Sequence, residues 1–99
     1  MSTTAESLTI NSILASLGYS DPVAAARQQA RMILLGKLAH YQAVVQQLQS
    51  KWNCTLEELR ERYLAEGNED WQADQDYLEW HWHADAIENI QSQLATLQA

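Results

Sequence analysis

Two regular stripes of apolar residues constrain this chain more than any other feature of its sequence. In the first stripe the separations alternate between four and three positions, through Leu34, Leu38, Tyr41, Val45, Leu48 and Trp52. In the second they alternate between three and four, through Trp80, His83, Ile87, Ile90, Leu94 and Leu97. Heptad spacing of this kind places every member of a stripe on one side of an α-helix. The chain is therefore expected to form two long helices that pack along these stripes.

Capping signals mark where the expected helices begin. Asp21 before Pro22 is typical of an N-cap and a first helical residue, and predicts a long helix over about 22–52. Thr55 and Glu58 have the spacing of a capping box, in which hydroxyl and carboxylate each satisfy a backbone N–H, and predict a short helix over about 56–66. The second long helix is expected over about 74–98.

Other signals end these helices or suggest a further one. Gly18 and Asn53 suit helix ends, and Gly67 with Asn68 is expected to end the short helix. The apolar face of the short helix is assigned to Leu56, Leu59, Tyr63 and Leu64. A weaker apolar pattern predicts an N-terminal helix over about 7–17, after a disordered start over residues 1–6.

These elements predict an all-α fold in a single helical domain of 99 residues. Only 3 Gly and 1 Pro are available for turns, too few for a many-stranded sheet. Short connections favour antiparallel neighbours, so the expected arrangement is an antiparallel hairpin of the two long helices, with the short helix across one end. Two narrow stripes leave the flanks of such a hairpin exposed to solvent. We therefore expect the N-terminal helix, a partner protein or a second copy of the chain to complete the helical bundle, most simply as a dimer.

The charge of the chain is strongly acidic and unevenly distributed. The formal net charge is -7, every base lies between Arg27 and Arg62, and the residues after Arg62 carry acids alone. This balance argues against binding to a nucleic-acid backbone. It is consistent with a solvated surface, and equally with a docking surface for a basic partner.

A second apolar stripe occurs on the last helix, opposite its heptad stripe. It comprises Trp71, Leu78 and Trp82, and it lies among acids such as Glu79 and Asp85. One interpretation is a partner-binding surface made of these five residues, because Trp is enriched in binding hot spots. The alternative is that the stripe packs on the short helix, on the N-terminal helix or inside an oligomer of the chain.

No catalytic or metal-binding pattern is found. His81 and His83 are two positions apart and diverge on a helix, while each forms only a two-ligand pair, with Asp85 and Glu79 respectively. Cys54 is the only cysteine, which predicts a reducing compartment, and no apolar run approaches the length of a membrane span. We therefore expect a cytoplasmic protein that is not an enzyme and has no metal, cofactor or membrane contact.

Several short motifs resemble those of small prokaryotic antitoxin-like proteins. They are Lys37 with Tyr41, Leu48, Lys51-Trp52-Asn53, Thr55-Leu56-Glu57-Glu58-Leu59, Glu69-Asp70-Trp71 and Tyr77-Leu78-Glu79-Trp80. The resemblance covers about residues 32–97; Trp52-Asn53 stands where the family pattern has Tyr-Gly, and His81-Trp82-His83 is richer in rings. It implies a helical, non-enzymatic protein that neutralises a small basic toxin, often a ribonuclease, by direct contact.

Overall fold

The fold is all-α, as the sequence predicts. The computed structural model describes residues 2–65 and 71–98, with side chains described from Thr9 onward. Four helices follow one another along the chain: α1 (Ser2–Ser16), α2 (Pro22–Trp52), α3 (Leu56–Leu64) and α4 (Trp71–Gln98). No strand occurs among the residues described. The two long helices and the short helix between them are confirmed.

The predicted capping residues set the boundaries of α1 and α2. Gly18 adopts a φ of 93°, and the N–H of Tyr19 reaches back to the carbonyl of Leu14 at 2.9 Å, which closes α1 in a Schellman-type turn. The side chain of Asp21 accepts a hydrogen bond from the Ala24 N–H at 2.7 Å, as an N-cap should. At the other end of α2, Asn53 has a φ of 49°, the left-handed conformation expected there.

The capping box at α3 is only half formed. The hydroxyl of Thr55 accepts a hydrogen bond from the Glu58 N–H at 3.2 Å, as predicted. The Glu58 carboxylate instead accepts from the same hydroxyl, also at 3.2 Å. The start of the helix is thus predicted correctly, although the carboxylate has a different partner.

Three helix ends differ from the prediction. α1 begins at Ser2 rather than near residue 7, so it includes residues for which no order was expected. α3 ends at Leu64, with Ala65 as its C-cap, and the predicted stop at Gly67-Asn68 lies outside the described residues. α4 begins at Trp71 instead of residue 74, because tertiary and side-chain contacts stabilise its first turn. Ala73 is buried in the core, and the Gln72 side chain donates a hydrogen bond to the Asp76 carboxylate.

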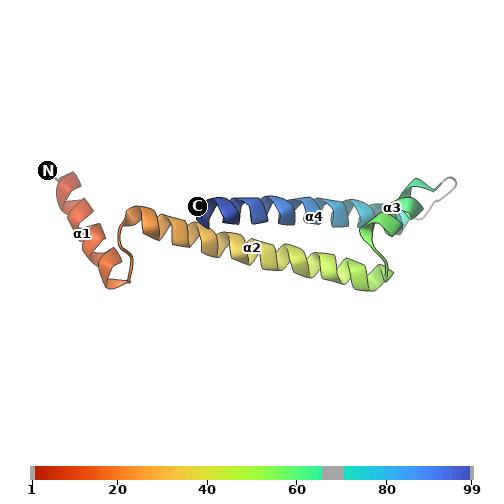
Figure 1. Ribbon diagram of the computed structural model, residues 1–99, viewed down its shortest axis with the longest axis horizontal. Coiled ribbons are helices and arrows are strands. Elements are labelled where there is room, and N and C mark those ends of the chain that lie inside the picture. Colours follow the sequence, from red (N-terminus) through yellow and green to blue (C-terminus); the bar gives the residue numbers. More distant parts are fainter. Residues whose placement is uncertain (1, 66–70, 99) are drawn as a thin grey trace. The chain divides into compact units, whose positions relative to one another are not determined.

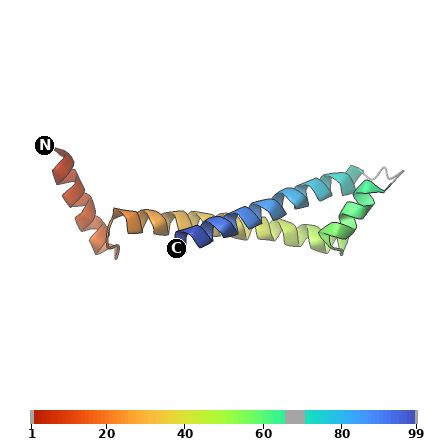
Figure 2. The same ribbon diagram turned by 45° about the horizontal axis from the view of Figure 1, so that its top comes forward.

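The chain divides into two compact units, residues 1–33 and residues 34–99. In the second unit, α4 runs antiparallel to the adjoining part of α2, with α3 at one end (Figure 1). Figure 2 shows that the two long helices cross at an angle and separate toward the α3 end, where α3 lies in the gap. The short helix therefore fills the space that a splayed pair of helices would leave.

The core of the second unit lies at this splayed end. Its buried members are Leu48, Leu59, Ala73, Tyr77 and Trp80. Leu59 is fully buried, and the rings of Tyr63 and Tyr77 stack with their centroids 4.8 Å apart. Leu64, which the sequence placed on the apolar face of the short helix, is 60% exposed. That assignment is wrong, because Tyr63 already faces α4 and the next residue turns away.

The heptad stripes line the hairpin. In α2, Leu48 is buried, and the other five stripe positions, Leu34, Leu38, Tyr41, Val45 and Trp52, are half-buried. In α4, the buried members are Trp80 and Ile90, and the half-buried ones are His83, Ile87, Leu94 and Leu97. Because no member of either stripe is exposed, both stripes belong to the packed side of their helices.

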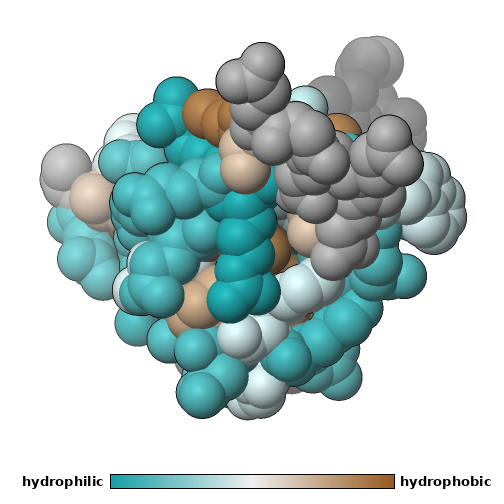
Figure 3. Space-filling model, turned by 90° about the vertical axis from the view of Figure 1, so that its right-hand side faces the viewer, coloured by the Kyte–Doolittle hydropathy of each residue, from teal (hydrophilic) through white to brown (hydrophobic). Residues whose placement is uncertain are grey.

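Residues 9–33 have no core of their own. None of them is buried, and their large apolar side chains are half exposed or more at Ile10, Ile13, Leu17, Val23, Met32 and Ile33. By contrast, the α3 end of the molecule presents a mostly hydrophilic surface with small apolar spots (Figure 3).

Candidate protein-docking surface

The predicted partner-binding residues form an exposed ridge on α4. Trp71, Leu78 and Trp82 are 67%, 55% and 57% exposed, and the side chains of Glu79 and Asp85 are exposed beside them. We call these five residues the α4 ridge. Side chains at separations of seven and four residues share one helix face, so the three apolar members are aligned. The ridge thus combines two indoles and a leucine with negative charge.

Trp71 and Leu78, two of the ridge residues, face away from the core. Trp80 and Ile87, on the opposite side of α4, pack toward α2, whereas α3 contacts α4 through the side that carries Tyr77. The alternative that the short helix covers Trp71, Leu78 and Trp82 is therefore wrong. The physical reason is that α3 lies where α2 and α4 separate, and leaves all three side chains more than half exposed.

Trp82 also belongs to a groove between α2 and α4. Its ring meets Tyr41 edge-on at 5.5 Å between centroids. The groove has a volume of about 280 Å³ and is lined by Leu34, Lys37, Tyr41, Trp82, Ala86, Asn89, Ile90 and Gln93. An apolar floor beside an ammonium group and side-chain amides suits one side chain of a partner better than a small polar ligand.

A buried carboxylate at the base of α4 was not predicted from the sequence. Asp76 is 4% exposed and accepts hydrogen bonds from Lys51 Nζ at 2.5 Å, Trp52 Nε1 at 2.8 Å and Gln72 Nε2 at 3.0 Å. Arg62 adds a cation above the Trp52 ring, 5.8 Å from its centroid. This network ties the end of α2 to the start of α4.

The electrostatics of Asp76 follow from these contacts. Burial by itself raises the pKa of the Asp76 carboxyl, but the hydrogen bonds from Lys51, Trp52 and Gln72, with the charge of Lys51, outweigh burial and lower the pKa below its ordinary value. The group is therefore ionised at neutral pH and paired. The only signal for this ion pair in the sequence is that Lys51 lies in a helix without Asp or Glu, so its partner must come from another segment. Nothing in the spacing identifies which acid that is.

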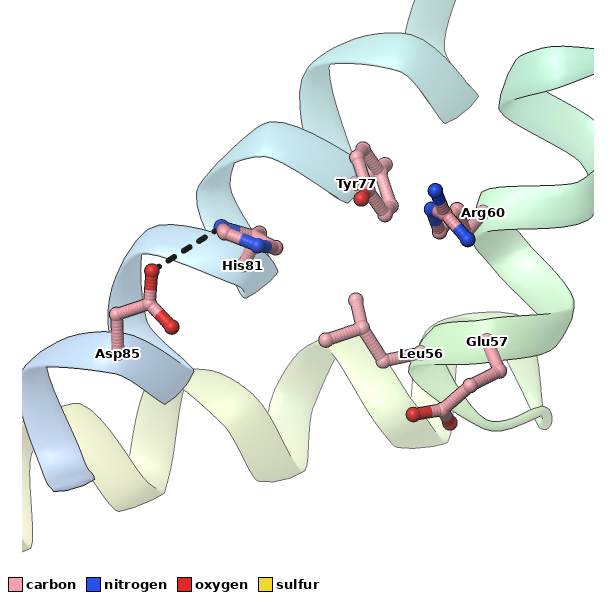
Figure 4. A pocket seen from close by; sticks show the side chains of 6 residues that line it. All are labelled: Leu56, Glu57, Arg60, Tyr77, His81 and Asp85. Carbon is pink, nitrogen blue, oxygen red and sulfur yellow. Dashed lines mark ion pairs between the residues drawn. The ribbon is translucent and has the colours of Figure 1, made fainter.

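A second cleft lies between α3 and α4 (Figure 4). It has a volume of about 440 Å³ and is lined by Leu56, Glu57, Arg60, Tyr77, His81 and Asp85. Arg60 projects from α3 toward Tyr77, and His81 Nδ1 lies 3.4 Å from a carboxylate oxygen of Asp85. Both members of that pair are more than half exposed, so solvent screens the interaction.

The remaining candidate residues do not gather into a reactive centre. His83 Nδ1 lies 2.7 Å from the backbone carbonyl of Glu79 rather than its carboxylate, and Cys54 is half-buried against the core. Within residues 2–65 and 71–98, no three His, Cys, Asp or Glu side chains are grouped so that they could hold a metal ion. Over the same residues, no helix has the length and apolar character needed to cross a membrane.

Charge separates the two units. Residues 1–33 contain two acids and two bases, whereas residues 34–99 contain eleven acids and four bases. Within α4 there are five acids and no Lys or Arg. The ridge therefore stands on the most acidic helix of the chain, where a positively charged partner is favoured.

Comparison with protein-family models, with curated proteins and with solved structures gives no match to this chain. Its function is therefore inferred from its own surface.

Proposed function

We propose that this chain is a protein-binding module without enzymatic activity, and that its α4 ridge docks on a basic protein. The observation that carries the proposal is the exposure of Trp71, Leu78 and Trp82 beside the acids Glu79 and Asp85. Tryptophan supplies a large apolar contact and is enriched in hot spots, while the acids complement Lys and Arg and speed association.

The resemblance to antitoxin-like proteins supports a more specific form of this proposal. In that form, the partner is a small basic toxin of the ribonuclease type, which the ridge neutralises by direct contact. A nuclease presents Lys and Arg where it binds phosphates, so an acidic inhibitor matches the potential of that surface. Lys37 and Tyr41, two residues of the resemblance, line the groove beside Trp82 and so lie close to the proposed contact.

A homo-oligomeric structural protein without a toxin partner is the alternative function. The uncovered apolar side chains of residues 9–33 favour some self-association. In the alternative, the ridge itself is also buried between copies. The two functions therefore differ in what covers Trp71 and Leu78.

The resemblance also implies that the chain is encoded beside its toxin, so the test uses the protein encoded by the adjacent reading frame as the binding partner. Trp71→Ala and Leu78→Ala are each expected to weaken the complex by about 2 kcal/mol, roughly thirtyfold in affinity, if these side chains are hot spots. Leu64→Ala is the matched control, because Leu64 is 60% exposed on α3 and lies off the ridge. Trp82→Ala is less informative, since it also removes the contact with Tyr41.

Two results would contradict the proposal. One is a complex that Trp71→Ala and Leu78→Ala leave unchanged. The other is the absence of any complex with a basic neighbour, combined with an oligomer of the free chain that dissociates when either ridge residue is replaced. That second result would favour the structural alternative.

A further inference from the structure

Residues 9–33 carry apolar surface that the chain itself leaves uncovered. None of these residues is buried, and Ile13 in α1 and Val23 and Ile33 in α2 are half exposed or more. Helices in proteins are stabilised mainly by packing of their apolar side, and in this region neither α1 nor the first three turns of α2 has such packing. A second apolar surface would therefore stabilise this region.

The first three turns of α2 have the pattern of a helix-pairing face. Val23, Ala26, Ala30 and Ile33 follow one another at separations of three, four and three, so they lie on one side of the helix. Val23 and Ile33, at the ends of this row, are 67% and 51% exposed. The two alanines between them allow the backbone of a second helix to approach closely. We call these four residues the N-terminal stripe of α2.

Charge indicates what covers this stripe. Residues 1–33 contain two acids and two bases, so contact through this region keeps the acids of residues 34–99 away from the interface and adds no local charge repulsion. Contact through α4 would instead bring together two helices with five acids each and no base. A basic partner, for its part, is attracted to the acidic unit rather than to this one.

We propose that the N-terminal stripe of α2 is the interface between two copies of this chain. The stripe supplies the apolar contact, and the neutral charge balance of residues 1–33 permits like copies to associate. The acidic ridge on α4 then stays available to a different protein. This proposal goes beyond the proposed function and does not depend on it.

The test is the mass of the full chain in solution, measured by sedimentation or light scattering at micromolar concentrations. The wild type is expected to form a dimer. Val23→Glu and Ile33→Glu each put a carboxylate in an apolar contact, and are expected to raise the dimer dissociation constant about tenfold or more. Leu64→Glu makes the same change at a side chain of similar exposure on α3, and is expected to leave the dimer unchanged.

A wild-type chain that is monomeric throughout the micromolar range would overturn the proposal. A dimer that Val23→Glu and Ile33→Glu leave intact, or that Leu64→Glu weakens equally, would also overturn it. Circular dichroism checks that each variant keeps its helices. If a glutamate variant loses helicity, Ala30→Gln decides the case, because glutamine keeps high helix propensity while placing an amide in the stripe. No basic protein is present in these measurements, so their failure leaves the ridge proposal untouched.

Discussion

Residues 9–33 and residues 34–98 are built from the same kind of helix, but they are stabilised differently. The second region has Leu48, Leu59 and Trp80 buried where three helices meet. The first has no buried residue at all. The difference shows that helical periodicity creates an apolar face, and that stability comes only when another face covers it. A helix can therefore be regular in sequence and still depend on a partner.

The largest expected contrast between the two regions is in core truncation. Leu59→Ala removes a fully buried side chain and should lower the free energy of unfolding by about 2–5 kcal/mol. Ile13→Ala, at a side chain that is 53% exposed, should change it by less than about 0.5 kcal/mol. Urea unfolding of both variants measures the difference. Equal losses would mean that α1 is packed into the same core.

Loss of the buried carboxylate should have the next largest effect. Asp76→Ala leaves the Trp52 indole N–H without its acceptor in a partly buried site and removes the partner of Lys51. We expect a destabilisation of about 2 kcal/mol, measured by thermal unfolding. Asp85→Ala is the matched control, because that carboxylate is 67% exposed, and it should have little effect. If Asp76→Ala leaves the stability of the chain unchanged, the network does not hold α2 to α4.

The same carboxylate should make the second region sensitive to acid. Because the pKa of Asp76 is lower in the folded chain than in the unfolded chain, its stabilising effect is fully present above the ordinary aspartate pKa of about 3.9 and is lost as the pH falls through the lower, folded value. The free energy of unfolding of the wild type should therefore decrease over that acidic range. Asp76→Asn should show a smaller decrease, and an identical pH profile for the two proteins would contradict the assignment.

The smallest expected effect is a gain in stability. Gly36 lies inside α2, and a Cβ built on it would meet nothing within 4 Å. Gly36→Ala should therefore stabilise the chain by about 0.5–1 kcal/mol through helix propensity alone. Chemical denaturation measures the gain, and a loss of stability would indicate that another chain approaches α2 closely at this residue.

The order and approximate bounds of the helices are largely predictable from the sequence, because they depend on local signals. Asp21, Asn53 and Thr55 mark helix ends by their own backbone and capping chemistry, and the structure uses all three. Alternating separations of four and three residues placed the packed sides of α2 and α4. The predicted start of α4, at residue 74, is three residues too late, because the first turn is stabilised by the burial of Ala73, which is a tertiary contact.

The details of the candidate site were less predictable. Exposure of the ridge depends on where α3 packs, and the sequence left open whether α3 covers Trp71 and Leu78. The ion pair between Lys51 and Asp76 joins residues 25 positions apart on different helices, and several acids in the same region were equally plausible partners. Periodicity along one helix cannot identify contacts that depend on how two helices cross.

Native-state hydrogen exchange tests most directly whether the folding core lies in residues 34–98 while residues 9–33 lack one. The measurement uses the chain at a concentration where it is monomeric. Amides around Leu59 and Trp80 are expected to exchange only with global unfolding, and amides of residues 10–30 are expected to exchange with opening free energies near zero. Equal protection across α1, α2 and α4 in the monomer would contradict the account.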